Sequence, residues 1–226
     1  MTIAEELTQT MEPLLDAVYA AGKEAGGTGG DDLFPYITSC SSLFYESQFP
    51  SGYEMVANMP RVSKIDSMFR KVTGIRKLTL NVSIKNSSGE DKVYNAGYFF
   101  YGTTSVIPDI EEIVLPDGIK FSDFGRFAGY CKYLKTISGR IDLSENTVTT
   151  YCFMYCYALE EVRFVPNTIG VSIDFGHSGN LSDESIASII SGLSCDASGQ
   201  TLTVHPTVAA KITETDVTDR GWSLAY

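Results

Sequence analysis

The sequence predicts an α/β repeat protein, built as a solenoid of short parallel strands with a helix at its N-terminus and an α+β unit that caps its C-terminal end. Two observations lead to this fold class. Short apolar segments recur along the middle of the chain with a constant internal spacing, and this spacing is lost near the C-terminus, where helix-like and strand-like segments alternate. One such segment cannot bury its own apolar edge, whereas stacked copies cover one another.

The recurring unit has apolar residues at offsets 0, +3, +6, +9 and +11. Its two clearest copies are Phe69, Val72, Ile75, Leu78, Leu80 and Phe153, Cys156, Leu159, Val162, Phe164. Partial copies are Cys131, Leu134, Ile137, then Ile107, Ile110, Ile113, Leu115, and a truncated first copy from Cys40 to Leu43. The +9 and +11 residues lie on one side of a short strand, because side chains alternate along β-structure.

The distance between equivalent aliphatic residues sets the length of each coil. The steps are 32, 35, 24 and 25 residues for the series Leu43, Ile75, Ile110, Leu134 and Leu159. The last two steps fall in the range of about 20–29 residues that is typical of leucine-rich repeats. The longer early steps predict loops, one of them at residues 86–91. We therefore expect a leucine-rich-repeat solenoid over residues 34–178, with these aliphatic residues in one column.

Residues 1–24 are predicted to form a helix, because their apolar residues follow the alternating steps of four and three of a coiled-coil seam. Only about two heptads fit, and Pro13 weakens the run, so the helix is marginal on its own. It either docks on its own domain or serves as an attachment segment through which a homo-oligomer forms. Residues 25–33 are rich in glycine and predict a flexible linker.

Residues 179–226 lack the repeat spacing and predict a C-terminal cap. Ser182, followed by Asp183 and Glu184, indicates a helix start, with a capping hydroxyl and acids at the positive end of the helix dipole. Residues 186–193 give this helix one apolar face. Further elements are expected at residues 201–204 (a strand), from Pro206 onward (a short helix) and at residues 221–224 (a strand).

Several segments resemble the BspA-type leucine-rich repeat proteins of bacterial cell surfaces and phages. They are the unit from Phe153 to Phe164, the stretch from Ser39 to Leu43, Leu181-Ser182 at a helix start, residues 199–204, and the closing Gly221-Trp222. The resemblance covers roughly residues 39–226. It implies a curved repeat surface that is used for adhesion or recognition, without catalysis. It also implies a protein or glycan partner on a cell surface, bound by a bacterial surface protein or by a phage tail-associated, receptor-binding part.

The charge and hydropathy of the chain exclude some partners. Its 17 basic and 28 acidic side chains give a net charge of −11, which argues against nucleic acid, because binding to phosphates requires clustered Lys and Arg. No apolar run approaches the ~20 residues of a membrane helix, so no membrane insertion is expected. The N-terminus lacks the basic start and apolar core of a secretory signal. We expect an extracellular or virion-associated protein, and a cytoplasmic location stays open.

No residue set predicts a catalytic centre, a metal site or a cofactor. His177 lies within residues 174–178, but the members of a Ser-His-Asp triad fill separate places in space, which adjacent residues cannot do. The acidic pairs at residues 111–112 and 160–161 occupy equivalent positions of two repeats, and the repeat alone explains them. The five cysteines are odd in number and lack zinc-site spacing, so we expect buried free thiols.

Two surfaces are candidate binding sites. The first is the outward face of the predicted strands, which is mixed in charge and suits a polar protein or a glycan, or is an ordinary solvated face. Its candidate residues are Lys77, Thr79, Glu112, Ser138, Glu161 and Arg163. The second is a set of tyrosines near the repeat cysteines, Tyr130, Tyr133, Tyr155 and Tyr157. Exposed tyrosine stacks on sugars and anchors protein interfaces; the alternative is that these rings pack between coils.

The first functional hypothesis is a non-enzymatic recognition or adhesion protein that binds a protein or glycan through its repeat surface. The alternative is a structural virion or assembly component, in which the repeats are a spacer and the N-terminal helix makes the contact. A hydrolase is the third hypothesis, disfavoured because no set of acid and base residues converges in the sequence.

Overall fold

The computed structural model describes residues 41–226. The predicted N-terminal helix (residues 1–24), the glycine-rich linker (residues 25–33) and Cys40 lie outside the described residues. Between residues 41 and 226, no helix combines the length and the apolar character that a bilayer crossing requires.

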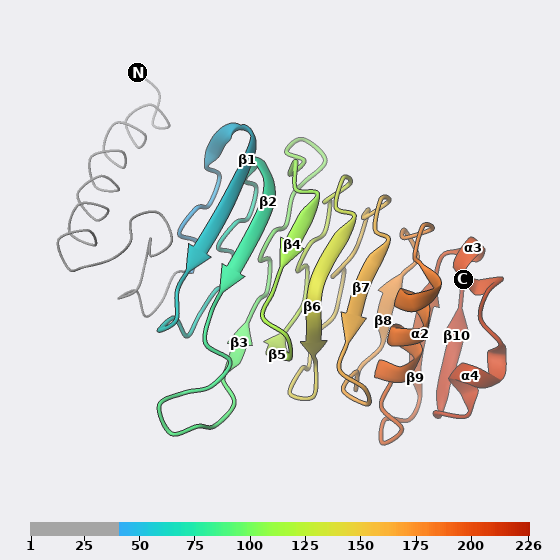
Figure 1. The fold of residues 1–226 in the computed structure, drawn as a ribbon. Coiled ribbons are helices and arrows are strands. Elements are labelled where there is room, and N and C mark those ends of the chain that lie inside the picture. The colour runs from blue at the N-terminus through green and yellow to red at the C-terminus, as the bar shows by residue number, and fades with distance from the viewer. Residues whose placement is uncertain (1–40) are drawn as a thin grey trace.

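Strands dominate the described part of the chain, and its few helices are short and lie near the C-terminus (Figure 1). The strands are β1 (Gln48–Asn58), β2 (Thr73–Asn81), β3 (Val93–Asn95), β4 (Glu112–Val114), β5 (Ile119–Asp123), β6 (Thr136–Asp142), β7 (Glu161–Phe164), β8 (Ile173–Phe175), β9 (Gln200–Val204) and β10 (Trp222–Ala225). The helices are α2 (Asp183–Gly192), α3 (Pro206–Ala209) and α4 (Glu214–Thr218).

Seven of the strands form one parallel sheet in the order β1-β2-β4-β6-β5-β3, with β7 also paired to β6. Its central register is regular: Lys77 of β2 pairs with Glu112 of β4, which pairs with Thr136 of β6. The register continues just before the strands, where the amides of residues 111, 135 and 160 each donate to the preceding layer. Equivalent positions in successive layers are therefore taken by four buried aliphatic residues, Ile75, Ile110, Leu134 and Leu159.

The sheet rolls at β6. The first part of this strand, Thr136–Ser138, pairs with β4, whereas Ile141 and Asp142 pair with β5. Between them lies Gly139, with φ at 87°; a Cβ at this position would stand 2.3 Å from the Leu115 carbonyl oxygen. Because glycine has no side chain, the backbone of β6 passes close to the segment that follows β4. One continuous strand thus joins two parts of the sheet, a first limb that contains β4 and a second limb that contains β5. The sheet curves between the two limbs into a half-barrel (Figure 1).

The fold class predicted from the sequence is therefore wrong. Residues 41–226 form a rolled, mostly parallel sheet with few helices, and not a leucine-rich-repeat solenoid. Apolar spacing reports which side chains are buried, but it does not report how far each strand runs or which neighbours it pairs with. Here β6 is long enough to join two limbs, and no helix interrupts the seven-stranded sheet. The N-terminal helix of the same prediction lies outside the described residues.

The apolar positions of the recurring unit make up the core, as predicted. In its two clearest copies, from Phe69 to Leu80 and from Phe153 to Phe164, every unit position is at most 1% exposed. Phenylalanine rings of successive layers stack in four pairs, with centroid distances of 5.2, 5.1, 5.3 and 5.0 Å: Phe44 with Phe69, Phe69 with Phe100, Phe99 with Phe127, and Phe153 with Phe175. Each such pair contributes about 0.5–1.5 kcal/mol beyond the area that it buries.

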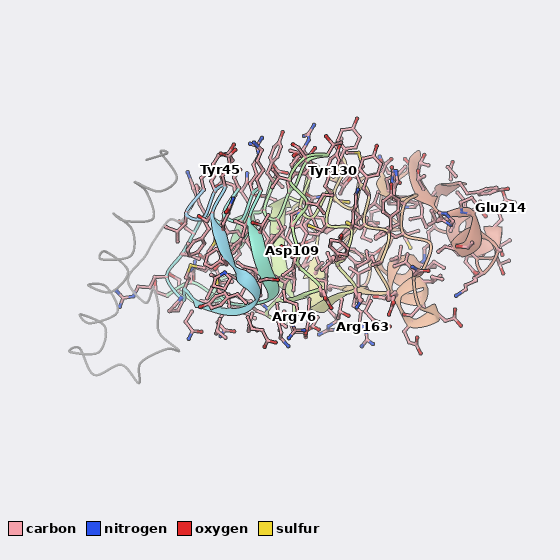
Figure 2. All side chains as sticks on the ribbon, turned by 90° about the horizontal axis from the view of Figure 1, so that it is seen from above. Tyr45, Arg76, Asp109, Tyr130, Arg163 and Glu214 are labelled. Atoms are coloured by element: carbon pink, nitrogen blue, oxygen red, sulfur yellow. The ribbon has the colours of Figure 1, made fainter. Side chains whose placement is uncertain are left out.

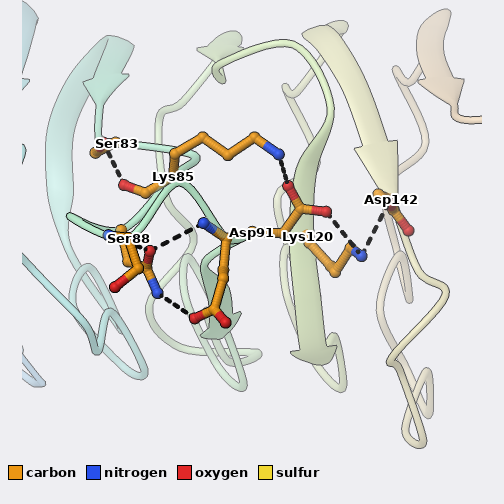
Figure 3. Close-up of polar contacts among 8 residues, drawn as sticks. Ser83, Lys85, Ser88, Asp91, Lys120 and Asp142 are labelled. Atoms are coloured by element: carbon orange, nitrogen blue, oxygen red, sulfur yellow. Dashed lines mark hydrogen bonds and ion pairs between the residues drawn. The ribbon is translucent and has the colours of Figure 1, made fainter.

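The predicted loop at residues 86–91 is confirmed, and polar contacts tie it to the sheet (Figure 3). Asp91 forms ion pairs with Lys85 of the loop and with Lys120 of β5, the latter at 3.3 Å. Lys120 also lies 3.8 Å from Asp142, at the end of β6. The long step between neighbouring units is thus taken up by a loop that docks on the second limb of the sheet.

The predicted elements near the C-terminus are confirmed. Ser182 caps α2, and its hydroxyl accepts a hydrogen bond from the Ser185 amide at 3.1 Å; α3 begins at Pro206. The strands β8, β9 and β10 form a second parallel sheet. Buried Trp222 fixes the last strand, because its indole N–H donates to the Ser194 carbonyl at 2.9 Å. Figure 1 shows these elements at the end of the half-barrel opposite β1.

Three cysteines are buried free thiols, as predicted, and Cys195 is exposed instead. The thiols of Cys131 and Cys156 donate to backbone carbonyls of the preceding layer, both at 3.0 Å. Burial raises the pKa of the Cys131, Cys152 and Cys156 thiols well above the usual value, because a thiolate would lose its hydration. These three side chains therefore act as small apolar groups of the core.

Replacing Gly139 by alanine is expected to destabilise the rolled sheet, because the new Cβ would meet the Leu115 carbonyl oxygen. The free energy of unfolding, measured by urea denaturation, should fall by roughly 2–4 kcal/mol. Gly118→Ala is the matched control: Gly118 has φ at 73° but open space around it, so alanine there costs only about 1 kcal/mol. Equal losses in the two variants would show that the close approach at β6 is unimportant.

Thiol labelling checks the core in a different way. In a Cys40→Ser variant, an aromatic disulfide reagent should label Cys195 quickly, whereas Cys131, Cys152 and Cys156 should react only as the protein unfolds. Peptide mass spectrometry identifies the labelled residues. Fast labelling of any of the three buried thiols in the native protein would contradict their place in the core.

Candidate functional site

The outward face of the sheet carries the first set of predicted binding residues. Five of them are half-buried there and the last is exposed: Lys77, Thr79, Glu112, Ser138, Glu161 and Arg163. Lys77 lies 2.9 Å from Glu112, and Arg163 lies 3.9 Å from Glu161, so these charges neutralise one another. The predicted column is also interrupted, because a register shift between β6 and β7 places Arg163 opposite Arg140. The charged side chains of this face are thus engaged with one another.

A second ladder of backbone hydrogen bonds joins the turn segments that precede the strands. In four layers, an amide donates to a carbonyl of the next segment at 2.9–3.0 Å; the donors are Ser42, Ser67, Tyr98 and Arg126. A second amide, four residues further along each segment, also donates to a carbonyl of the next segment, at 2.7–3.0 Å. These donors are Glu46, Lys71, Gly102 and Tyr130. The turn segments therefore stack as regularly as the strands do, and side chains at equivalent positions form columns.

Aromatic and cationic side chains gather on these turn segments. Figure 2 shows Tyr45 and Tyr130 on one side of the molecule and Arg76 and Arg163 on the opposite side. We call this surface the tyrosine edge, and it comprises Tyr45, Arg70, Tyr98, Tyr101, Arg126, Tyr130, Tyr151, Tyr155, Tyr157 and His177.

One series of ring contacts runs along the tyrosine edge. Its centroid distances are 5.4, 5.5, 4.8 and 4.5 Å, and it passes through Tyr98, Tyr101, Tyr130, Tyr155 and His177 in that order. Tyr157 joins it at 5.9 Å from Tyr155. Tyr98 and Tyr101 come from one turn segment, whereas Tyr130, Tyr155 and His177 each come from a later segment. The series therefore connects several layers of the fold.

Two arginines connect the tyrosines in a second series. The Arg70 guanidinium lies 5.5 Å from the Tyr45 ring centroid and 4.8 Å from that of Tyr98. The Arg126 guanidinium lies 5.0 Å from the Tyr98 centroid and 5.2 Å from that of Tyr151. A cation–π contact of this kind contributes about 0.5–1 kcal/mol at an exposed site and about 2 kcal/mol when it is desolvated. Tyr98 thus contacts one guanidinium from the preceding segment and one from the following segment.

Four of these tyrosines occupy the left-handed region of backbone conformation. The φ angle is 60° at Tyr98, 68° at Tyr130, 59° at Tyr151 and 61° at Tyr155. A residue with a side chain costs roughly 1–2 kcal/mol in this region, and glycine would avoid that cost. Other turn segments hold Ser42, Glu46, Ser67, Lys71 and Arg126 in the same conformation, so the left-handed backbone belongs to the repeated turn and tyrosine is one of the residues that occupy it.

The rings are held closely against the backbone. A Cβ on Gly129 would lie 2.8 Å from two carbons of the Tyr101 ring, so the missing side chain makes room for that ring. Loss of solvent raises the pKa of the Tyr130 phenol, and the neighbouring Tyr101 and Tyr155 raise it further, because a phenolate would be poorly hydrated there. The series of rings is thus partly dehydrated and well fixed.

The structure brings together three of the four predicted tyrosines, whose rings pack against one another between layers; their role in binding stays a prediction. Tyr130 and Tyr155 are half-buried and Tyr157 is exposed, all in ring contact, whereas Tyr133, 53% exposed, lies outside the series. Sequence reasoning did not name Tyr45, Arg70, Tyr98, Tyr101 or Arg126 as binding residues, and it considered His177 only for catalysis. These positions could have been aligned on the phenylalanine of each turn segment. The residues inserted after Gly102 hide that spacing in the sequence.

Residues considered for catalysis are engaged in other contacts. His177 packs with its ring centroid 4.5 Å from that of Tyr155, within the tyrosine edge. Glu111 forms an ion pair with Lys135 at 3.3 Å. Among the residues that the structure describes, no group of three or more His, Cys, Asp or Glu is placed to hold a metal ion.

No protein-family model, no curated protein and no solved structure matches this chain. The resemblance to BspA-type proteins stays a prediction from the sequence. The tyrosine edge, which joins aromatic and cationic groups of many layers, is therefore the basis on which the function is inferred.

Tyr98 is expected to stabilise the edge through its ring and not through its hydroxyl, because both arginine contacts are made to the ring. Tyr98→Ala should lower the free energy of unfolding by about 1–3 kcal/mol, and Tyr98→Phe by less than about 0.5 kcal/mol. Tyr133→Ala, at an exposed tyrosine outside the series, is the control and should change little. Urea denaturation measures all three, and a harmless Tyr98→Ala would refute the cation–π series.

Proposed function

We propose that the protein is a non-enzymatic recognition protein that binds a glycan through its tyrosine edge. The ring contacts that join Tyr98, Tyr101, Tyr130 and Tyr155 across layers carry this proposal. The positive φ of the turn is shared by other layers, in which Ser, Glu or Lys occupies it. A binding role gives a reason for tyrosine at several of these positions.

The shape of the edge favours a glycan. Its members come from turn segments that are bonded to one another, so aromatic and cationic groups from several layers lie along one row. A linear polymer of sugars can extend along such a row and meet several rings. Tyrosine combines a ring face, which packs on the apolar face of a sugar, with a hydroxyl that exchanges hydrogen bonds with sugar hydroxyls. Tyr151 and Tyr157, 46% and 47% exposed, are open to such contacts.

The edge is also organised before any ligand arrives. Backbone hydrogen bonds hold each turn segment to the next, and ring contacts restrict the side chains. Binding therefore needs little additional ordering of the protein, which favours affinity for a polymer whose own flexibility is reduced on binding. A cell-surface or virion setting for this interaction remains a prediction from the sequence.

Replacing Tyr130 and Tyr155 together by alanine tests the proposal. The wild-type protein is screened on an array of bacterial and host oligosaccharides, and the affinity for each hit is measured by calorimetry. The double alanine variant should lose at least about tenfold in affinity, because each stacked ring contributes on the order of 1 kcal/mol. The double phenylalanine variant keeps the rings and should retain most of the binding.

Tyr226→Ala is the matched control, since Tyr226 is 79% exposed and lies outside the tyrosine edge. Thermal unfolding establishes that every variant is folded. A wild-type protein that binds no oligosaccharide of the array, or a double alanine variant with unchanged affinity, would contradict the proposed function.

A further inference from the structure

The two arginines of the tyrosine edge carry charges that no acid of the described residues neutralises by direct contact. None of the ion pairs between residues 41 and 226 includes Arg70 or Arg126. Glu46 bonds to Lys71 at 2.6 Å and interacts with Arg70 only at longer range, which contributes to the lowered pKa of Glu46, and Asp123 accepts the Gly125 amide at 2.8 Å. In a chain of net charge −11, these two guanidiniums form a local positive site.

The contacts with the tyrosine rings determine which hydrogen-bond donors of each guanidinium can still bind a ligand. Tyr45, Arg70, Tyr98, Arg126 and Tyr151 follow one another along the edge, so each guanidinium is in contact with two rings. The N–H donors of a guanidinium lie in its plane and point away from its rim. Rings packed on the group therefore hold its plane and leave the donors at the rim free to bind an acceptor. Arg70 Nε is buried and has no hydrogen-bond partner in the described structure, so the terminal Nη donors are the ones that a ligand can reach.

These donors match one kind of group best. A carboxylate is planar and accepts two parallel hydrogen bonds from a guanidinium, with more strength than a neutral hydroxyl. The two arginines are separated by the Tyr98 ring, so acidic groups that recur along a polymer can engage both while sugar rings meet the neighbouring tyrosines. Neutral sugars would leave both guanidiniums without a direct ion-pair partner.

We propose that the glycan is a polyuronate, a polysaccharide with carboxylates on its sugars, and that Arg70 and Arg126 bind these carboxylates. This inference rests on the proposed function and adds the ligand class. The tyrosines supply contact area for the sugar rings, and the two arginines supply the selectivity for the acidic form. Single-stranded nucleic acid, which also presents rings and anionic groups, is disfavoured by the net charge of −11 and is an outcome of the test.

Calorimetry with an oligogalacturonate and with its fully methyl-esterified form tests the inference. The two probes differ only in the charge and hydrogen-bonding capacity of the carboxyl group. The wild-type full-length protein should bind the acid at least about tenfold more tightly than the ester, which is the range expected for a charged hydrogen bond. Added salt should weaken the binding of the acid more than that of the ester.

Variants of the two arginines locate the effect. The double variant Arg70→Gln/Arg126→Gln should lose about tenfold or more in affinity for the acid and little for the ester. Arg126→Lys keeps the charge but lacks the planar fork, so it should fall between the wild type and Arg126→Gln. Arg163→Gln, on the opposite side of the molecule (Figure 2), is the matched control and should bind as the wild type does.

The outcomes separate this inference from the proposed function. Equal affinity for acid and ester, with both lost in the Tyr130→Ala/Tyr155→Ala variant, overturns the polyuronate and leaves glycan binding intact. If neither the oligogalacturonate nor its methyl ester binds, the polyuronate is overturned, and the oligosaccharide array then tests the proposed function. Tighter binding of single-stranded DNA than of the oligogalacturonate through the same arginines overturns both. If the glutamine variants unfold, the ratio of the wild-type affinities for the acid and for the ester still tests the polyuronate.

Discussion

Parallel backbone pairing between chain segments 22 to 35 residues apart is the interaction on which the rest of the structure depends. It operates twice in each layer, once between strands and once between the turn segments that precede them. The two ladders differ in offset where residues are inserted between them, but the turn segments of successive layers are bonded to one another, so their phenylalanine rings can stack. A single layer would leave its apolar edge in water, so the layers are stable only together.

The same pairing produces the candidate site. Side chains of successive turn segments lie next to one another, and on the tyrosine edge these neighbours are aromatic rings and guanidiniums at distances of 4.8–5.5 Å. The opposite face is built from the same layers, but its charges pair with one another. The two faces therefore differ in what they offer to a ligand, although the backbone beneath them is equally regular.

The sequence allowed the buried positions, the helix that begins after Ser182 and the loop before β3 to be predicted, because burial and capping leave local patterns. It did not reveal the rolled sheet, since the curvature depends on the close approach of Gly139 to Leu115, which are remote in sequence. For the site, the position beside each repeat cysteine led to Tyr130 and Tyr155. Arg70 and Arg126 were missed because their role depends on stacking between layers and on left-handed turns, neither of which a spacing of aliphatic residues reports.

Amide chemical-shift mapping during titration with an oligogalacturonate tests most directly that the tyrosine edge is the binding surface. The account predicts the largest shifts at residues 98–102, 126–130 and 151–157, with small shifts along β2, β4 and β6. Shifts centred on the strand face around Lys77, Glu112 and Ser138, or no shifts at all, would contradict it.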